Sequence, residues 1–134
     1  MENICYNCFG DSLESLDISC FDTANVTDMC SMFSCCFDLT SLDLSGFDTS
    51  HVTDMFQMFY GCRNLTHLDL SNFDTANVTR MTYMFDGCEV LTSLNLSGFH
   101  AGNDTNLEDM FTDCSSLTNL QCTDSAILNA YKKR

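Results

Sequence analysis

Aspartates recur at a fixed spacing in this chain. Among its residues, they are the best candidates to bind a metal ion or a cationic partner. Asp17, Asp43 and Asp69 form one set with a step of 26 residues, and Asp22, Asp48 and Asp74 form a second set with the same step. A column of carboxylates can supply oxygen ligands to calcium or attract a cationic partner. Alternatively, the first set is simply solvated, and each carboxylate of the second set bonds backbone amides of its own turn. Both interpretations stay open for the first set, whereas the second set favours bonding within turns.

Other residues that could carry chemistry show no such order. Cys5 and Cys8 form a CxxC, but a zinc or redox site needs a second ligand pair or a βαβ context, and neither is found. His51, His67 and His100 are interpreted as surface histidines. The sequence contains no HExxH, glycine-rich phosphate loop or Ser-His-Asp order. We therefore expect no catalytic residues and no enzyme.

The regular aspartates belong to a longer repeat. The stretch LTSLDLSGFDTSHVTDMFQMFYGC begins at Leu39, close copies begin at Leu13, Leu65 and Leu91, and a partial fifth copy begins at Leu117. A period between 20 and 50 residues is the signature of a solenoid. The predicted organisation is an N-terminal cap, four repeats, and a partial repeat with a C-terminal cap: 1–12, 13–38, 39–64, 65–90, 91–116 and 117–134.

Each repeat opens with LxxLxL, in which leucines alternate with polar residues. That alternation is typical of a short strand with one buried face, and stacked repeats place such strands in a parallel sheet. The polar side chains then share the other face. We call this the strand face, and its members are Ser15, Asp17, Ser41, Asp43, His67, Asp69, Ser93 and Asn95.

The second half of each repeat has a different spacing. Val26, Met29, Met32, Phe33 and Cys36 follow one another by three or four residues, which predicts a short helix with an apolar stripe toward the core. The methionines and phenylalanines are interpreted as core rather than as a binding groove. The cysteines in the last slot are interpreted as buried thiols rather than disulfides: Cys36, Cys62, Cys88 and Cys114.

The fourth repeat departs from the pattern. His100 replaces an aspartate, Asp104 falls in the valine slot and Leu107 replaces a methionine. Because an unpaired buried aspartate is costly, we expect residues 100–106 to be irregular: either the backbone bulges outward at Asp104 or the aspartate caps the following helix. The tail SAILNAYKKR predicts a helix that covers the last repeat.

Charge and hydropathy exclude several classes of partner. The 134 residues carry a formal net charge of −14, which repels nucleic acid and anionic lipid headgroups. No apolar stretch is long enough to predict membrane insertion, and the start MENICYNCFG does not have the build of a signal peptide or an anchor. A cationic or neutral partner fits this charge better.

The consensus LxxLDLSxFDTxxVTDMxxMFxGC, which covers Leu13 to Cys114, resembles the repeat of BspA-like leucine-rich-repeat surface proteins of bacteria. That resemblance implies an α/β, right-handed, curved solenoid with one parallel strand and one short helix per repeat. It also implies a place at the bacterial cell surface or in secretion, and adhesion to host or neighbouring-cell molecules. We expect a monomeric, non-enzymatic module that binds a protein or glycan through the strand face. A structural spacer or self-assembly element, and a module stabilised by calcium at Asp17, Asp43 and Asp69, are the alternatives.

Overall fold

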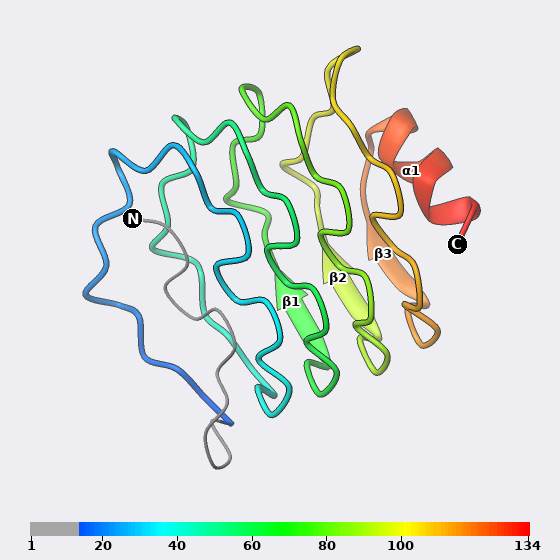
Figure 1. Ribbon diagram of the computed structural model, residues 1–134, viewed down its shortest axis with the longest axis horizontal. Coiled ribbons are helices and arrows are strands. Elements are labelled where there is room, and N and C mark those ends of the chain that lie inside the picture. Colours follow the sequence, from blue (N-terminus) through cyan, green and yellow to red (C-terminus); the bar gives the residue numbers. More distant parts are fainter. Residues whose placement is uncertain (1–13) are drawn as a thin grey trace.

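The computed structural model describes residues 14–134, which contain nearly all of the repeated sequence. The predicted N-terminal cap, with Cys5 and Cys8, lies outside the described residues, as does Leu13. Successive repeats form coils of chain that lie side by side from the N-terminal to the C-terminal end (Figure 1). We number them coil 1 (the described part of 13–38), coil 2 (39–64), coil 3 (65–90) and coil 4 (91–116).

Three short strands form a parallel sheet in the order β1-β2-β3. They are β1 (His67–Asp69), β2 (Ser93–Asn95) and β3 (Asn119–Gln121). The register confirms the 26-residue step, since Leu68 pairs with Leu94 and Leu94 with Leu120. Coils 1 and 2 are less regular than predicted, because their strand segments are joined by a single parallel bridge between Ser15 and Ser41. The parallel sheet is therefore confirmed, but its regular strands are confined to coils 3 and 4 and the chain that follows.

The prediction of a helix in every repeat is wrong. Among the described residues the one helix is α1 (Ser125–Lys132), and the segments expected to be helical are chains of turns. Alternate backbone N–H groups in these segments donate to carbonyl oxygens of the next coil. In coil 1 the N–H of Met29 bonds the carbonyl of Asp54 at 3.0 Å, and that of Phe33 bonds Met58 at 2.9 Å. We call the segments 28–36, 54–62, 80–88 and 106–114 the turn ladder.

The backbone angles explain why these segments do not form helices. The N–H of Met32 donates to the carbonyl of Met29, and the N–H of Cys36 donates to the carbonyl of Phe33. Each segment therefore contains consecutive four-residue β-turns. In the four-residue turns 29–32 and 33–36, and in their counterparts in the other coils, the third residue has a positive φ, for example 55° at Ser31 and 74° at Gly87. A turn with positive φ at that position resembles type II, and it returns an apolar residue to the core at nearly the spacing of a helix. Hydrophobic spacing alone therefore cannot separate the two structures.

The core lies between the strands and the turn ladder. The turn-ladder phenylalanines stack along the molecule, with ring centroids 5.6 Å apart for Phe33 and Phe59 and also for Phe59 and Phe85. The cysteine column is buried, as predicted, and the thiols of Cys88 and Cys114 donate to the carbonyls of Phe59 and Phe85 at 3.2 and 3.0 Å. The methionine and phenylalanine stripe is confirmed as core packing.

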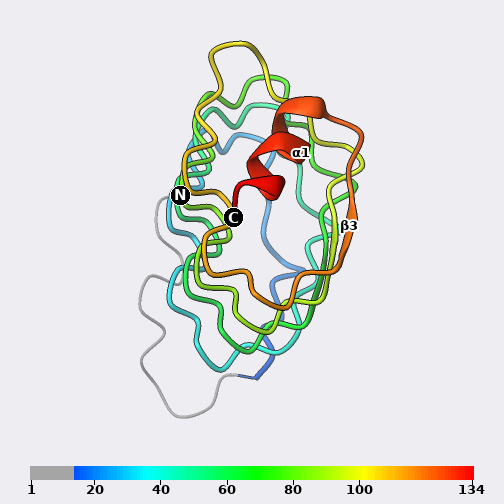
Figure 2. The ribbon, with the colours of Figure 1, turned by 90° about the vertical axis from the view of Figure 1, so that its right-hand side faces the viewer.

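The C-terminal end of the stack is closed by α1. Its N-cap Asp124 accepts from the N–H groups of Ala126 and Ile127, and Ile127 is fully buried. The tail thus forms the predicted helix. Figure 2, which looks at this end, shows α1 over the middle of the last coil, with β3 along one side and the turn ladder along the other. No helix in the described part of the chain is long and apolar enough to cross a membrane.

Residues 100–106 carry the expected irregularity. Asp104 is exposed, and its slot in the other coils holds the buried Val26, Val52 and Val78. Coil 4 also has Ala101 where the earlier coils have a buried threonine that bonds the next coil. The N–H of Ala101 donates instead to Asp124 Oδ2 at 3.0 Å, so the helix cap completes this side of coil 4.

Candidate binding surface

The strand face is built by the sheet and by the matching segments of coils 1 and 2. Its serines, aspartates and histidine in the first three coils are exposed, while Ser93 and Asn95 are half-buried. The register places His67 beside Ser93 and Asp69 beside Asn95. These residues therefore lie on one side of the molecule, opposite the turn ladder (Figure 2). The structure brings the predicted residues into a common surface.

Each aspartate of this surface is held by the turn that ends its strand segment. Asp17 and Asp43 Oδ1 both accept the N–H of the serine two residues on at 3.0 Å, and Asp69 does so at 2.9 Å. Asn95 makes the same bond in coil 4 at 3.1 Å, with its amide oxygen in place of a carboxylate. The sequence predicts this bonding for the second aspartate set, where it also occurs, for example from the N–H of Ala24 to Asp22 Oδ1 at 3.1 Å. For the first set, simple solvation is therefore corrected to bonding within the turn. The bonds hold the carboxylates at the strand ends.

The same hydrogen bonds keep these carboxylates charged. Bonds from the Ser19 side chain, and then from its amide, lower the pKa of Asp17 below its ordinary value. At Asp43 the amide of Ser45 is the larger cause of a lowered pKa and its side chain the smaller. Hydrogen bonding to the charged form favours ionisation. The face is therefore anionic at neutral pH and down into the acid range.

A hollow of about 300 Å³ lies where the strand segments of coils 1 and 2 end. Asp17 and Asp43 line it together with Phe21 and Phe47, so two carboxylates stand beside an apolar floor. Carboxylates accept hydrogen bonds from hydroxyl, amide and ammonium groups, and aromatic rings offer apolar contact. The hollow can thus receive a small polar group carried on an apolar frame.

The surface extends further than the sequence predicted. β3 continues the register, with Asn119 beside Ser93 and Gln121 beside Asn95. Asn119 Nδ2 also donates to Ser93 Oγ at 3.1 Å. The partial fifth repeat LTNLQC contains both residues, so the signal for them was the same alternation of leucines with polar residues.

The structure does not bring Asp17, Asp43 and Asp69 into a metal-binding group. Among the described residues the one group of three with suitable ligand spacing is Asp28, Cys30 and Asp54 on the turn ladder. Arg80 already lies there, with Nη2 2.5 Å from Asp54 Oδ2 and 3.6 Å from Cys30 Sγ. A guanidinium thus supplies the positive charge at that group. Calcium binding by the strand-face aspartates stays a prediction.

Two of the buried cysteines, Cys88 and Cys114, are poor nucleophiles. Burial raises the pKa of the Cys88 thiol well above its ordinary value, and it raises that of Cys114 to about 12. Since the thiolate is the reactive form, these side chains act as packing groups. Cys88 and Cys114 therefore contribute packing rather than a reactive thiol.

The parallel strands and stacked coils are those of a leucine-rich fold. The structure is similar to a leucine-rich cell surface protein from Faecalibacterium prausnitzii A2-165, with a TM-score of 0.52 and 23% sequence identity over 75% of this chain. At that identity the likeness concerns the fold. The chain spans about a quarter, 24%, of the length of that protein.

The family of the chain follows from its sequence. Residues 1–124 match the family described as "Mycoplasma protein of unknown function, DUF285", and the chain belongs to that family. No curated protein matches the chain.

Proposed function

We propose that this chain is a non-enzymatic interaction module of a BspA-like solenoid at a bacterial cell surface, and that it binds a protein or glycan through the strand face. The observation that carries the proposal is the hollow at coils 1 and 2, where Asp17 and Asp43 are ionised and held in place beside Phe21. Stacked repeats commonly bind partners through such an extended surface. The fold likeness to a cell surface protein supports the location.

The chemistry of the face favours a partner rich in hydrogen-bond donors. Carboxylates accept and do not donate when ionised, and the neighbouring serines can do both. Sugar hydroxyls, and lysine or arginine side chains of a protein, provide such donors. Because the carboxylates are already fixed by the Ser19 and Ser45 amides, little side-chain freedom is lost when a ligand binds.

The test compares two aspartates that have the same local bond but lie on different surfaces. A glycan array and a panel of host matrix proteins would first identify a ligand of the wild-type chain. Asp43→Lys should then weaken binding by about tenfold or more, which corresponds to about 1.4 kcal/mol. Asp74→Lys is the matched control, because Asp74 also accepts an N–H two residues on, from Ala76 at 3.0 Å, yet lies outside the strand face.

Circular dichroism melting of both variants checks that the fold is kept. Equal losses for Asp43→Lys and Asp74→Lys would indicate a general effect of charge. Unchanged binding by Asp43→Lys would place the site elsewhere on the molecule.

A further inference from the structure

The turn ladder continues in register as far as coil 4. In coil 3 the N–H of Met81 donates to the carbonyl of Asn106 at 2.9 Å and that of Phe85 to Met110 at 3.0 Å. The corresponding donors of coil 4 are the N–H groups of Leu107, Asp109, Phe111 and Asp113. Within the part of the chain that the structure describes, none of these four N–H groups donates to a protein acceptor. We call this row the donor edge.

The donor edge differs from the edge of an ordinary sheet. The carbonyls of Asn106, Glu108, Met110 and Thr112 accept from coil 3, and those of Leu107, Asp109 and Phe111 accept from N–H groups three residues on. The row thus presents donors without acceptors, whereas a β-strand edge presents both. Two copies cannot pair symmetrically through it, since donor would face donor. Its complement is a row of acceptors, such as the carbonyls of a peptide.

The preceding coils show what such a complement looks like. The donors of coil 2, at Met55, Gln57, Phe59 and Gly61, bond the carbonyls of Arg80, Thr82, Met84 and Asp86. The segment 78–87 therefore covers in coil 2 the edge that is uncovered in coil 4. An added segment with the same backbone path would continue the ladder.

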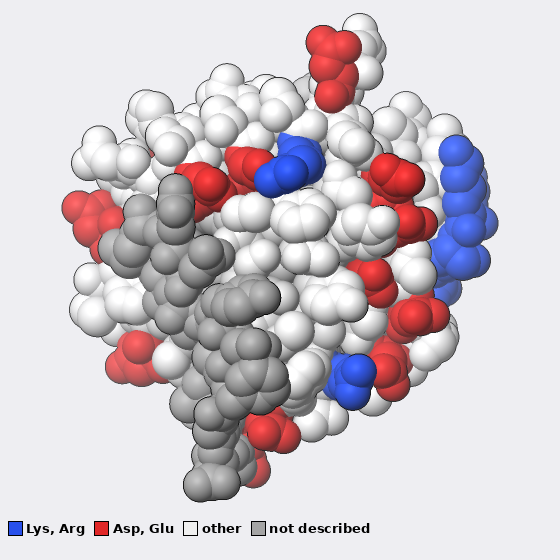
Figure 3. All heavy atoms as spheres, viewed as in Figure 1, with Lys and Arg blue, Asp and Glu red and all other residues white. Residues whose placement is uncertain are grey.

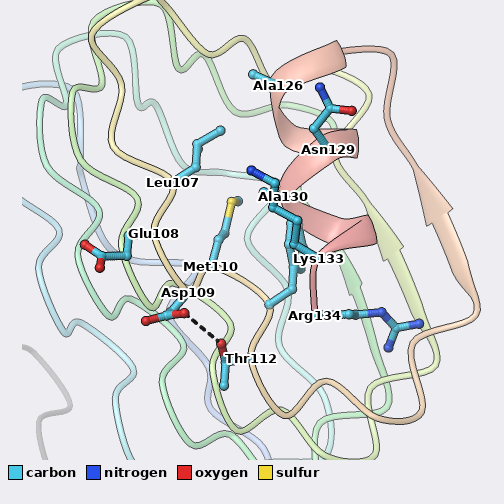
Figure 4. A pocket seen from close by; sticks show the side chains of 11 residues that line it. Leu107, Glu108, Asp109, Met110, Thr112, Ala126, Asn129, Ala130, Lys133 and Arg134 are labelled. Atoms are coloured by element: carbon cyan, nitrogen blue, oxygen red, sulfur yellow. Dashed lines mark hydrogen bonds between the residues drawn. The ribbon is translucent and has the colours of Figure 1, made fainter.

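Space for such a segment exists between the donor edge and α1. A groove of about 420 Å³ lies there, within the range of ligand sites. Figure 4 shows Leu107 and Met110 directed toward the helix, while Glu108 and Asp109 point away from it. The helix contributes the small side chains Ala126 and Ala130 to the opposite wall. The groove thus has an apolar floor beside a row of backbone donors.

Acidic side chains follow the same edge. Glu108, Asp109 and Asp113 are exposed, and Asp86 is half-buried beside them. Burial, and then the charges of Asp113 and Asp109, raise the pKa of Asp86, so these carboxylates lie near one another. Figure 3, which views the turn-ladder face, shows acidic side chains gathered near its C-terminal end.

Basic groups at this end offset part of that charge. The guanidinium of Arg134 already donates to the carbonyls of Cys114 and Leu117, so it is less available to pair with the carboxylates. Lys133 lines the groove as well. Lys132 lies beside Asp113 in a neighbouring hollow. The four carboxylates of Asp86, Glu108, Asp109 and Asp113 therefore face three cations, of which Arg134 is already bonded to carbonyls, so a basic occupant fits better than an acidic one.

We propose that the donor edge is a second interaction surface, which takes an extended segment of a partner protein that carries lysine or arginine. The backbone carbonyls of the segment accept from Leu107, Asp109, Phe111 and Asp113, and its basic side chains pair with the carboxylates along the edge. Addition of a segment to an open backbone edge is an established mode of peptide recognition. The surface lies on the side opposite the strand face, so the two sites are independent.

The probe is a synthetic peptide with the sequence of residues 77–87 and the changes Tyr83→Lys and Asp86→Lys, which bring basic side chains opposite Asp109 and Asp113. Added to the full-length, nitrogen-15-labelled chain, it should slow amide hydrogen exchange at Leu107, Asp109, Phe111 and Asp113 by about tenfold or more. Met110 and Thr112 already donate within the chain and should change little. The same peptide with glutamate at both positions should bind about tenfold more weakly, or about 1.4 kcal/mol.

Three results would overturn the proposal. One is the absence of saturable binding up to about 1 mM peptide, equivalent to about −4.1 kcal/mol. Another is binding that leaves the four amides unprotected. The third is protection of the four amides that depends on protein concentration without peptide, since a second copy would then be the occupant.

A protein variant provides an independent check. Glu108→Lys should weaken peptide binding several-fold while the melting temperature stays close to that of wild type. Glu89→Lys is the matched control, because Glu89 is also exposed but pairs with Arg63 at 3.5 Å outside the groove. Equal effects of the two substitutions would show that the peptide responds only to the overall charge of the protein, which would contradict docking at this edge.

Discussion

The strand side and the turn-ladder side of each coil are built from the same repeat, yet they hold the molecule together differently. Both use aspartates that bond an amide two residues on: Asp43 accepts from Ser45 at 3.0 Å and Asp54 from Phe56 at 2.8 Å. On the strand side, three-residue strands pair in parallel. On the turn-ladder side, alternate N–H groups reach the next coil and the rest close local turns.

This difference determines what each side can offer a partner. A strand pairs through its backbone and leaves its side chains on an open face, so recognition on the strand side rests on carboxylates and hydroxyls. The turn ladder buries most of its apolar side chains and ends in a row of unopposed amides. Recognition there rests on the backbone. Substitutions on the two sides should therefore differ in their effects on stability.

Phe59→Ala should be the most damaging single truncation on the turn-ladder side. Its ring is fully buried and stacks at 5.6 Å on each of two neighbouring rings, so a cavity would break the column. The expected loss is about 3–5 kcal/mol of unfolding free energy in urea titrations. Leu68→Ala, on the strand side, should lose about 2–5 kcal/mol and less than Phe59→Ala. A larger loss at Leu68 would mean that the sheet, not the turn ladder, holds the main core.

Gly87→Ala should destabilise the turn ladder by about 1–2 kcal/mol. Gly87 has a φ of 74°, which penalises any residue with a Cβ, and that Cβ would also lie 3.4 Å from Gly61 Cα. Gly46→Ala is the control on the strand side, since Gly46 lacks a positive φ and has open space around it. There alanine should stabilise by about 0.4–1 kcal/mol through the unfolded state. Thermal melts that shift both variants in the same direction would contradict the assigned backbone angles.

Much of the strand side could be predicted from the repeat alone. Alternation of leucine with polar residues has a period of two, which few structures other than a strand satisfy. It therefore placed Asp43 and His67 correctly on an exposed face. It did not predict that the strands in coils 1 and 2 would shrink to the Ser15–Ser41 bridge, because strand length depends on pairing between coils.

The turn-ladder side was not predictable in the same way. The core positions were predicted correctly, since the apolar side chains are buried: Met29, Met32, Phe33 and Cys36. However, consecutive turns bury side chains at these positions as well as a helix does. A clue lay in Gly61 and Gly87, which recur in one slot and have positive φ. Other residues of the turn ladder, such as Gln57 and Tyr83, also have a positive φ. Their residue types do not predict this conformation. The donor edge could not be inferred without this backbone path.

Gln57→Gly separates the turn ladder from a helix directly. In a helix interior, glycine would cost about 0.5–1 kcal/mol relative to alanine. Gln57 instead has a φ of 54°, so glycine relieves a left-handed conformation that costs an ordinary residue about 1–2 kcal/mol. Part of that gain is offset by the greater freedom of glycine in the unfolded chain, and the net change should lie between zero and about 1 kcal/mol of stabilisation. A melting temperature below that of wild type would favour a helical segment.

Asp43→Asn and Asp86→Asn should have smaller effects, of opposite sign, that differ in their dependence on pH. Hydrogen bonds from Ser45 hold the pKa of Asp43 below the ordinary 3.8, whereas burial, Asp113 and Asp109 raise the pKa of Asp86 above it. The ionised form is thus favoured by folding at Asp43 and disfavoured at Asp86. At position 43 asparagine can keep the local bond, as Asn95 does in coil 4, so that substitution isolates the charge.

The sign of each effect follows from linkage. The contribution of Asp43 is complete above pH 3.8 and disappears as the pH falls through its lowered pKa, so Asp43→Asn should lower the melting temperature at pH 7 but not in strong acid. The penalty at Asp86 grows as the pH rises from 3.8 through its raised pKa, so Asp86→Asn should raise the melting temperature at pH 7 and lose this advantage below pH 3.8. Melting curves across this range check both. Changes of the same sign at pH 7 would show that the carboxylates of the strand side and the turn-ladder side have similar surroundings.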